Sequence, residues 1–145
     1  MTQEQNIELI TVDQLLDKVR ALRQQGQRLV QISATRLPDQ VELTYSFDLN
    51  DRLTNLRLFL PGIATRLPSI SSIYFCSILY ENEIHDLFNV QVDGLTVDFH
   101  GNFYKTRIKF PFGSIKAPCA KPATAPASGA TTCGTAPAAT TGANK

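Results

Sequence analysis

Acidic side chains and a histidine gather in one short segment of the chain, and they are the first candidates for chemistry. Glu81, Glu83 and Asp86 lie close together, with His85 among them. Two carboxylates about one helical turn apart could serve as a general acid and base. A catalytic site would also need a nucleophile, an orienting group and an oxyanion site, and no such set accompanies them. We therefore expect no catalytic residue in this chain.

The histidines and cysteines are the candidates for metal binding. Cys76 lies nine positions before His85, and His100 lies far from both in sequence. No pair has the spacing of a zinc or iron–sulfur site. Cys119 and Cys133 are widely spaced and have only Lys121 nearby to activate a thiol. The chain also lacks a glycine-rich phosphate-binding loop. We expect no metal and no bound cofactor.

A basic and aromatic segment, residues 103–112, is the second notable feature. Lys105, Arg107 and Lys109 alternate with aromatic and apolar residues, and the segment ends in Phe-Pro-Phe. Such interleaving occurs in readers of single-stranded nucleic acid, in surfaces that dock a partner, and in plain amphipathic strands. Residues 1–116 carry 12 Lys and Arg against 13 Asp and Glu. This balance favours docking or a structural strand, and a small nucleic-acid-binding module that uses this segment is the alternative.

The elements that would position these residues follow from periodicity. Helical spacing and a Gly stop predict an amphipathic helix over about residues 12–25. Strands are predicted at 28–34, 41–48 and 53–60, with turns at Pro38-Asp39 and Asn50-Asp51. A second helix is predicted over about 71–88 and ends before Asn89. Residues 90–99 are expected to be extended, with a turn at Asp93-Gly94. A second turn is expected at His100-Gly101-Asn102, followed by a weakly alternating strand at 103–112.

This order predicts an α+β fold in which the first helix packs on a three-stranded antiparallel meander. The second helix and an extended C-terminal arm follow. Residues 1–116 form the expected domain. Residues 117–145 are mostly Ala, Pro, Thr, Gly and Ser, 24 of 29. Such a composition cannot bury enough apolar surface to offset its ordering entropy, so we expect a disordered tail.

The second helix carries a motif. Its first part, Leu67-Pro-Ser-Ile70, comes just before the predicted helix. Its second part, Tyr80-Glu-Asn-Glu-Ile-His-Asp-Leu-Phe-Asn-Val90, covers the end of the helix and the two residues after it. This pair of segments resembles the signature of the complex I 30 kDa subunit family, in which an aromatic-Glu-Arg-Glu-x-x-Asp-Leu-Phe-Gly-Ile run follows a Pro-Ser. The resemblance covers about residues 10–95. Asn82 replaces the family arginine, and Asn89 replaces the family glycine.

The resemblance implies a non-catalytic docking subunit of a membrane-bound, ion-translocating oxidoreductase. The short chain is most similar to the corresponding subunit of energy-converting (group 4) nickel–iron hydrogenases; an NADH-, quinone- or formate-linked complex is the alternative. The implied partners are the large catalytic subunit, hydrogenase-like or complex I 49 kDa-like, and a small iron–sulfur subunit. The predicted interface residues are Glu81, Asn82, Glu83, His85, Asp86, Phe88, Lys105, Arg107 and Lys109.

The expected location is the cytoplasm, at the inner face of the cell membrane. The longest apolar-rich stretch, Ile70 to Leu79, is too short to span a bilayer. Nor does the polar beginning of the sequence show the pattern of a secretory signal. Membrane association is therefore expected only through the complex, and nucleic acid is not an expected partner.

Overall fold

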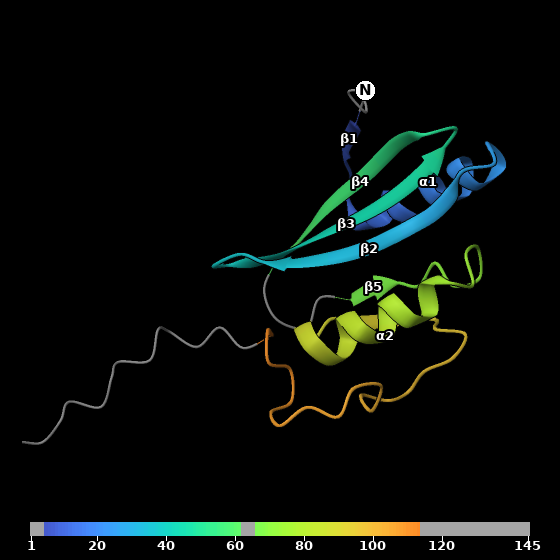
Figure 1. The fold of residues 1–145 in the computed structure, drawn as a ribbon. Coiled ribbons are helices and arrows are strands. Elements are labelled where there is room, and N and C mark those ends of the chain that lie inside the picture. The colour runs from blue at the N-terminus through green and yellow to red at the C-terminus, as the bar shows by residue number, and fades with distance from the viewer. Residues whose placement is uncertain (1–4, 62–65, 114–145) are drawn as a thin grey trace, which may run out of the picture.

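The computed structural model describes residues 5–61 and 66–113. The predicted α+β class is confirmed, with two helices and a mixed four-stranded sheet (Figure 1). The predicted tail, Cys119 and Cys133 lie outside the described residues. The elements are β1 (Gln5–Leu9), α1 (Val12–Gln24), β2 (Arg28–Arg36), β3 (Gln40–Leu49), β4 (Arg52–Pro61), β5 (Arg66–Pro68), α2 (Ser77–Phe88) and β6 (Gln91–Asp93).

The sheet has the order β1-β4-β3-β2. Strands β2, β3 and β4 form the predicted antiparallel meander. Its second hairpin turns at Asn50 and Asp51, which both have positive φ, as a tight two-residue connection requires. Strand β1 was not predicted. It pairs in parallel with β4, and the sequence gives little sign of it because its Ile7 and Leu9 side chains are exposed.

The core is one buried cluster formed by α1, one face of the sheet, and apolar residues between β5 and the end of α2. Leu15, Val19 and Leu22 of α1 are buried, as the helical spacing predicted. In β3 and β4 the buried side chains alternate with less buried ones, and cross-strand pairs such as Leu43 with Leu58 face the same side. This apolar layer holds the meander and α1 together.

Helix α2 packs beside the edge strand β2 (Figure 1). A bulge interrupts the β2–β3 register between Leu29 and Gln31. The Tyr80 hydroxyl of α2 donates to the carbonyl of Val30 at this bulge, at 3.3 Å. Helix α2 starts at Ser77, later than predicted, and stops at Asn89, which has the left-handed conformation expected of a helix end.

Residues 94–113, called the strap from here on, differ from the prediction. The strand expected at 103–112 is wrong, because the strap contains no strand. The expected turns are present at Gly94 and at His100 and Gly101, and a further turn lies at Phe110, all with positive φ. Figure 1 shows it running along α2 on the side away from the sheet. The backbone groups of Val97, Phe99 and Tyr104 bond to side chains of α2, and the Phe112 N–H bonds to the carbonyl of Leu87. These groups are therefore not available for pairing with a strand.

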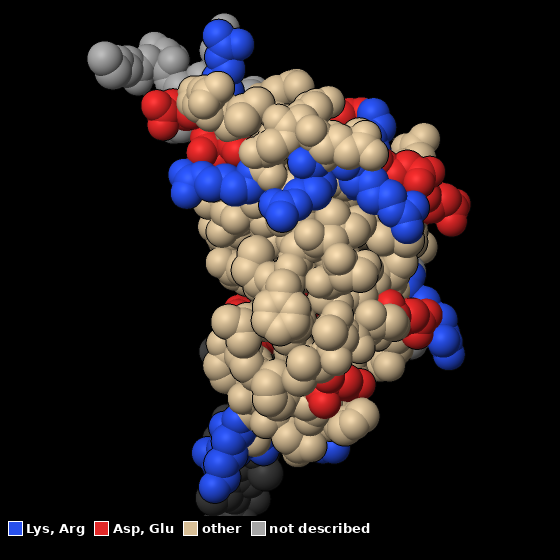
Figure 2. Space-filling view, turned by 90° about the vertical axis from the view of Figure 1, so that its right-hand side faces the viewer, with Lys and Arg blue, Asp and Glu red and all other residues tan. Residues whose placement is uncertain are grey.

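No helix within the described ranges is both long and apolar enough to cross a membrane. Figure 2 shows one face of the molecule, where Lys and Arg side chains gather in the upper half and a broad uncharged area lies below them. Exposed apolar side chains at the start of α2 include Phe75 and Leu79.

Candidate functional site

Glu81 lies inside the protein, with 0% of its surface exposed. Its carboxylate accepts hydrogen bonds from the Ser69 hydroxyl at 2.6 Å and from the Ile70 N–H at 2.8 Å. Burial raises the pKa of this carboxyl group, and these hydrogen bonds partly oppose the rise. Glu81 therefore fixes the Pro-Ser segment of the motif to α2. This predicted interface residue therefore lies inside the chain.

Asn82 is also fully buried and bonds the strap to α2. Its Nδ2 donates to the carbonyl oxygens of Ile78, at 2.8 Å, and of Val97, at 3.0 Å. Its Oδ1 accepts from the N–H of Phe99 at 3.0 Å. An arginine at this position would offer no acceptor to the N–H of Phe99, because a guanidinium group only donates hydrogen bonds. The replacement of the family arginine thus suits this chain's own strap.

Asp86 is 5% exposed and holds the next part of the strap. Its Oδ2 accepts from the N–H of Tyr104 at 2.8 Å, and its Oδ1 lies 3.2 Å from Nδ1 of His85. Asp86 lies on the outer face of α2, and it is buried there because the strap covers that face. The polar groups of Glu81, Asn82 and Asp86 are thus occupied within the chain.

Glu83 is the acidic residue of the motif that stays near the surface. Its Oε2 accepts from the Tyr104 hydroxyl at 3.3 Å. The negative charge of Glu83 raises the pKa of the Tyr104 phenol, with desolvation and this hydrogen bond acting in the same direction. Glu83 and Asp86 therefore hold two different groups of one residue, the hydroxyl and the backbone N–H of Tyr104.

The predicted cations lie on the strap. Lys105, Arg107 and Lys109 are exposed, and none forms an ion pair with another residue in the described part of the chain. Ile108 lies between two of them and is 67% exposed. Their predicted interface role is carried forward as a proposal.

The aromatic rings of the strap pack against one another and against α2. Phe103 contacts Phe99 and Tyr104, with ring centroids 5.3 and 4.8 Å apart. Phe112 lies against Phe88 of α2, at 5.5 Å. These rings contact other rings of the chain. A single-stranded nucleic acid would need such ring faces for base stacking, so the packing does not favour that partner.

The two histidines border a small hollow of about 80 Å³ together with Asp86, Tyr104 and Lys109. His100 lies on the surface and is paired with Asp98 at 3.2 Å. Within residues 5–61 and 66–113, no three His, Cys, Asp or Glu side chains group as metal ligands would.

Sequence reasoning did not find the hydroxyl groups that complete the buried network. The Ser71 hydroxyl bonds to those of Ser69, at 2.7 Å, and Thr96, at 2.8 Å, which links the Pro-Ser segment to the start of the strap. The fully buried Tyr45 hydroxyl has no hydrogen-bond partner among the described residues. Burial, and secondarily Glu81, raises its pKa. The Ser-x-Ser spacing before α2 was the available signal.

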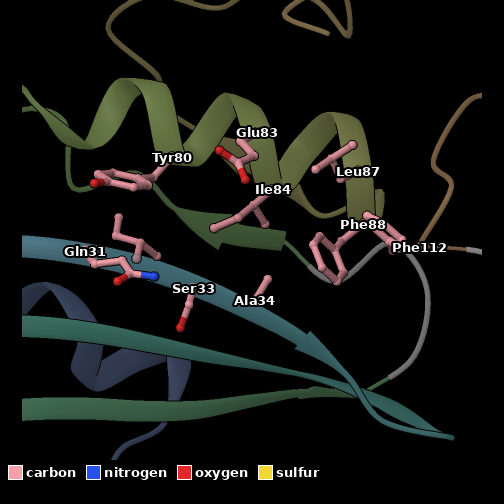
Figure 3. A pocket seen from close by; sticks show the side chains of 10 residues that line it. Gln31, Ser33, Ala34, Tyr80, Glu83, Ile84, Leu87, Phe88 and Phe112 are labelled. Carbon is pink, nitrogen blue, oxygen red and sulfur yellow. The ribbon is translucent and has the colours of Figure 1, made fainter. Parts of the chain in front are cut away.

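A groove separates α2 from the edge of the sheet (Figure 3). Its volume is about 270 Å³. One side is the β2 segment of residues 31–34, and the other carries Tyr80, Ile84 and Leu87 of α2, with Phe112 at one end.

The fold resembles two solved structures. A chain of an archaeal respiratory membrane complex, the membrane-bound sulfane sulfur reductase, matches with 21% identity and a TM-score of 0.63. The match covers 68% of this chain and 62% of that chain. A trypsin-resistant fragment of Nqo5 matches with 16% identity and a TM-score of 0.55, over 63% of this chain and 80% of that chain. A comparison with curated proteins finds no match.

The sequence model of a protein family also matches, over residues 9–118. That family is described as the 30 kDa subunit of respiratory-chain NADH dehydrogenase. The match includes both parts of the motif before and within α2, so the family resemblance predicted from those residues is confirmed. The chain belongs to the family of the 30 kDa subunit of respiratory-chain NADH dehydrogenase.

Proposed function

We propose that this chain is a docking subunit of a complex I-like respiratory assembly and that it binds the larger catalytic subunit. The hydrogenase-type complex is the specific version of the proposal, with a nickel–iron large subunit and a small iron–sulfur subunit as partners. The assembly would sit at the inner face of the cell membrane. Family membership supports the general role, and the similar folds occur in a respiratory membrane complex and in Nqo5.

The observation that carries the proposal is the set of free cations on the strap. Lys105, Arg107 and Lys109 have no ion-pair partner among the described residues and lie close in sequence to the exposed Ile108. An exposed apolar side chain next to unpaired cations fits a partner surface that offers both acidic and apolar groups.

Buried residues of the motif fix the backbone of the strap that carries these cations. Asp86 fixes the backbone of Tyr104, immediately before Lys105, and Asn82 fixes the backbone of Phe99. A segment that is held before binding loses less conformational entropy when the partner arrives. In this proposal, Asn82 and Asp86 act on docking through the strap, while Glu83, Phe88 and the three cations lie nearer the partner.

The experiment is purification of the chain together with a candidate nickel–iron large subunit. Charge reversal at Lys105 and Arg107 should weaken the complex and slow its association, because rim charges mainly affect association rates. The matched control reverses Arg20 and Arg52. Both are exposed, lie in α1 and β4 far from the strap in sequence, and change the net charge by the same amount. Failure to form a complex, or equal weakening by both pairs, would refute the proposed surface.

A further inference from the structure

Strand β1 lies at one end of the four-stranded sheet, and no described strand pairs with its outer edge. Among the described elements it packs extensively only against β4, whereas α2 lies beside β2 at the other end of the sheet. Strand β1 contains no proline and no lysine, and its pairing with β4 has no bulge. Edge strands commonly use these features to avoid pairing with another chain. The edge of β1 is therefore a place where a further strand can add.

The backbone of β1 presents hydrogen-bonding groups on this edge. The N–H of Ile10 donates to the carbonyl of Arg57 in β4 at 2.9 Å. Because the N–H and C=O groups of successive residues alternate between the two sides of a strand, those of Glu8 also face β4. The groups of Ile7 and Leu9 then face outward, and among the described residues none bonds to them. An added strand would find donors and acceptors in place.

The side chains along this edge are apolar on one face of the sheet. Glu8 pairs with Lys18 of α1, so Glu8 points toward α1. Side chains alternate along a strand, so its neighbours Ile7 and Leu9 point away from α1, and they are 49% and 68% exposed. Phe59 of β4 lies two positions beyond the register partner of Leu9, on the same face, and is 39% exposed. A strand with apolar side chains on this face would cover them.

The sequence of β1 fits a second copy of itself. In an antiparallel pair centred on Ile7, each Ile7 lies opposite the other and each Gln5 lies opposite Leu9, so all the outward backbone groups are paired. Glu8, the one charged residue of the strand, then lies opposite Asn6. Centring the pair on Glu8 would place two carboxylates opposite each other, which is destabilising. Centring it on Asn6 would leave Leu9 without a partner in the described strand. Charge and backbone pairing thus select one register.

We propose that two copies of this chain pair through β1, antiparallel and centred on Ile7, so that their two sheets become one. Ile7 and Leu9 of each copy then bury those of the other. A pair of five-residue strands is smaller than a standard interface of about 1,200–2,000 Å², so the dimer dissociates on dilution. The strap lies with α2 at the far end of each sheet, so pairing leaves it open and is independent of the docking function.

Sedimentation equilibrium of the full chain over a range of concentrations tests the proposal. The unaltered chain should pass from monomer to dimer as the concentration rises. Leu9→Lys should stay monomeric, because it places a cation in the apolar face of each copy. Leu79→Lys is the matched control: Leu79 lies on α2 and is 57% exposed, so the same substitution away from β1 should leave the dimer intact. An unaltered chain that stays monomeric up to about 1 mM, or an equal effect of the two substitutions, overturns the proposal.

Hydrogen exchange locates the contact. The N–H groups of Ile7 and Leu9 should exchange at least about tenfold more slowly in a concentrated sample than in a dilute one, since a dimer roughly 90% populated gives that protection. The N–H of Glu8 already faces β4 and should change less. Ile7→Pro removes one outward donor and keeps the groups that face β4, so it should also abolish the dimer. Protection of Ile7 and Leu9 that does not depend on concentration would show an occupant from the same chain, and slowing at Glu8 alone would show a different contact; either result overturns the proposal.

Discussion

Replacement of Asn82 by leucine should release the strap and lower the stability of the whole domain. The side chain is fully buried and makes three hydrogen bonds, to Ile78, Val97 and Phe99. A hydrogen bond within a protein contributes about 1 kcal/mol net, and a buried group left without a partner costs about 1–3 kcal/mol. The carbonyl of Ile78 lies within helix α2. The groups that mainly lose their hydrogen bonds are therefore the carbonyl of Val97 and the N–H of Phe99.

These contributions give an expected decrease of about 2–4 kcal/mol in the free energy of unfolding. Urea denaturation followed by circular dichroism measures this decrease as a lower midpoint. Limited proteolysis should show earlier cleavage within residues 94–113, because the strap loses its first attachment to α2.

Asn102→Leu is the matched control. Asn102 lies in the strap and its Nδ2 also donates to two carbonyl oxygens, those of Phe99 and His100, but the side chain is exposed. Water can replace its hydrogen bonds, so the same substitution should cost less than about 1 kcal/mol. If both variants unfold at the same urea concentration, or if Asn82→Leu costs less than about 0.5 kcal/mol, the buried network does not hold the strap as described.

Three other predictions concern the same region. Burial raises the pKa of Glu81 above its ordinary value, so the folded state binds the proton more tightly and stability falls as pH rises through the raised pKa; urea denaturation at several pH values should show this fall in the unaltered chain and a smaller one in Glu81→Gln. Glu83→Gln should lower the pKa of Tyr104, measured by ultraviolet absorbance during alkaline titration, and an unchanged titration would contradict the interaction. Gly113→Ala should destabilise the domain by about 1–3 kcal/mol in urea denaturation, because the new methyl group meets the backbone of Phe88; an unchanged midpoint would show that the strap end is not packed there.

The meander and α1 could be predicted because their signals are local. The alternation from Val41 to Asp48 reports one buried face, and the spacing of Leu15, Val19 and Leu22 reports one buried stripe. Both patterns arise within a single element, so they can be read without knowing what packs against it.

The burial of the motif could not be predicted in the same way. Asn82 and Asp86 are polar and lie on the side of α2 that a helical wheel assigns to solvent, yet residues well beyond the helix cover them. The strap has no periodicity because its backbone is satisfied by side chains and by turns at His100 and Gly101. In the sequence, the only sign of such long-range contacts is the presence of the polar residues that make them.

The parallel pairing of β1 has a consequence for the order of folding. Residues 5–9 pair with residues 53–57, so the first strand of the chain must wait for the last strand of the meander. The hairpins of β2, β3 and β4 close short loops, whereas β1 closes one that contains α1, β2 and β3, and its closure costs more entropy. We expect β1 to join after the rate-limiting step. Substitutions at Ile7 and Leu9 should then speed unfolding and leave the folding rate unchanged.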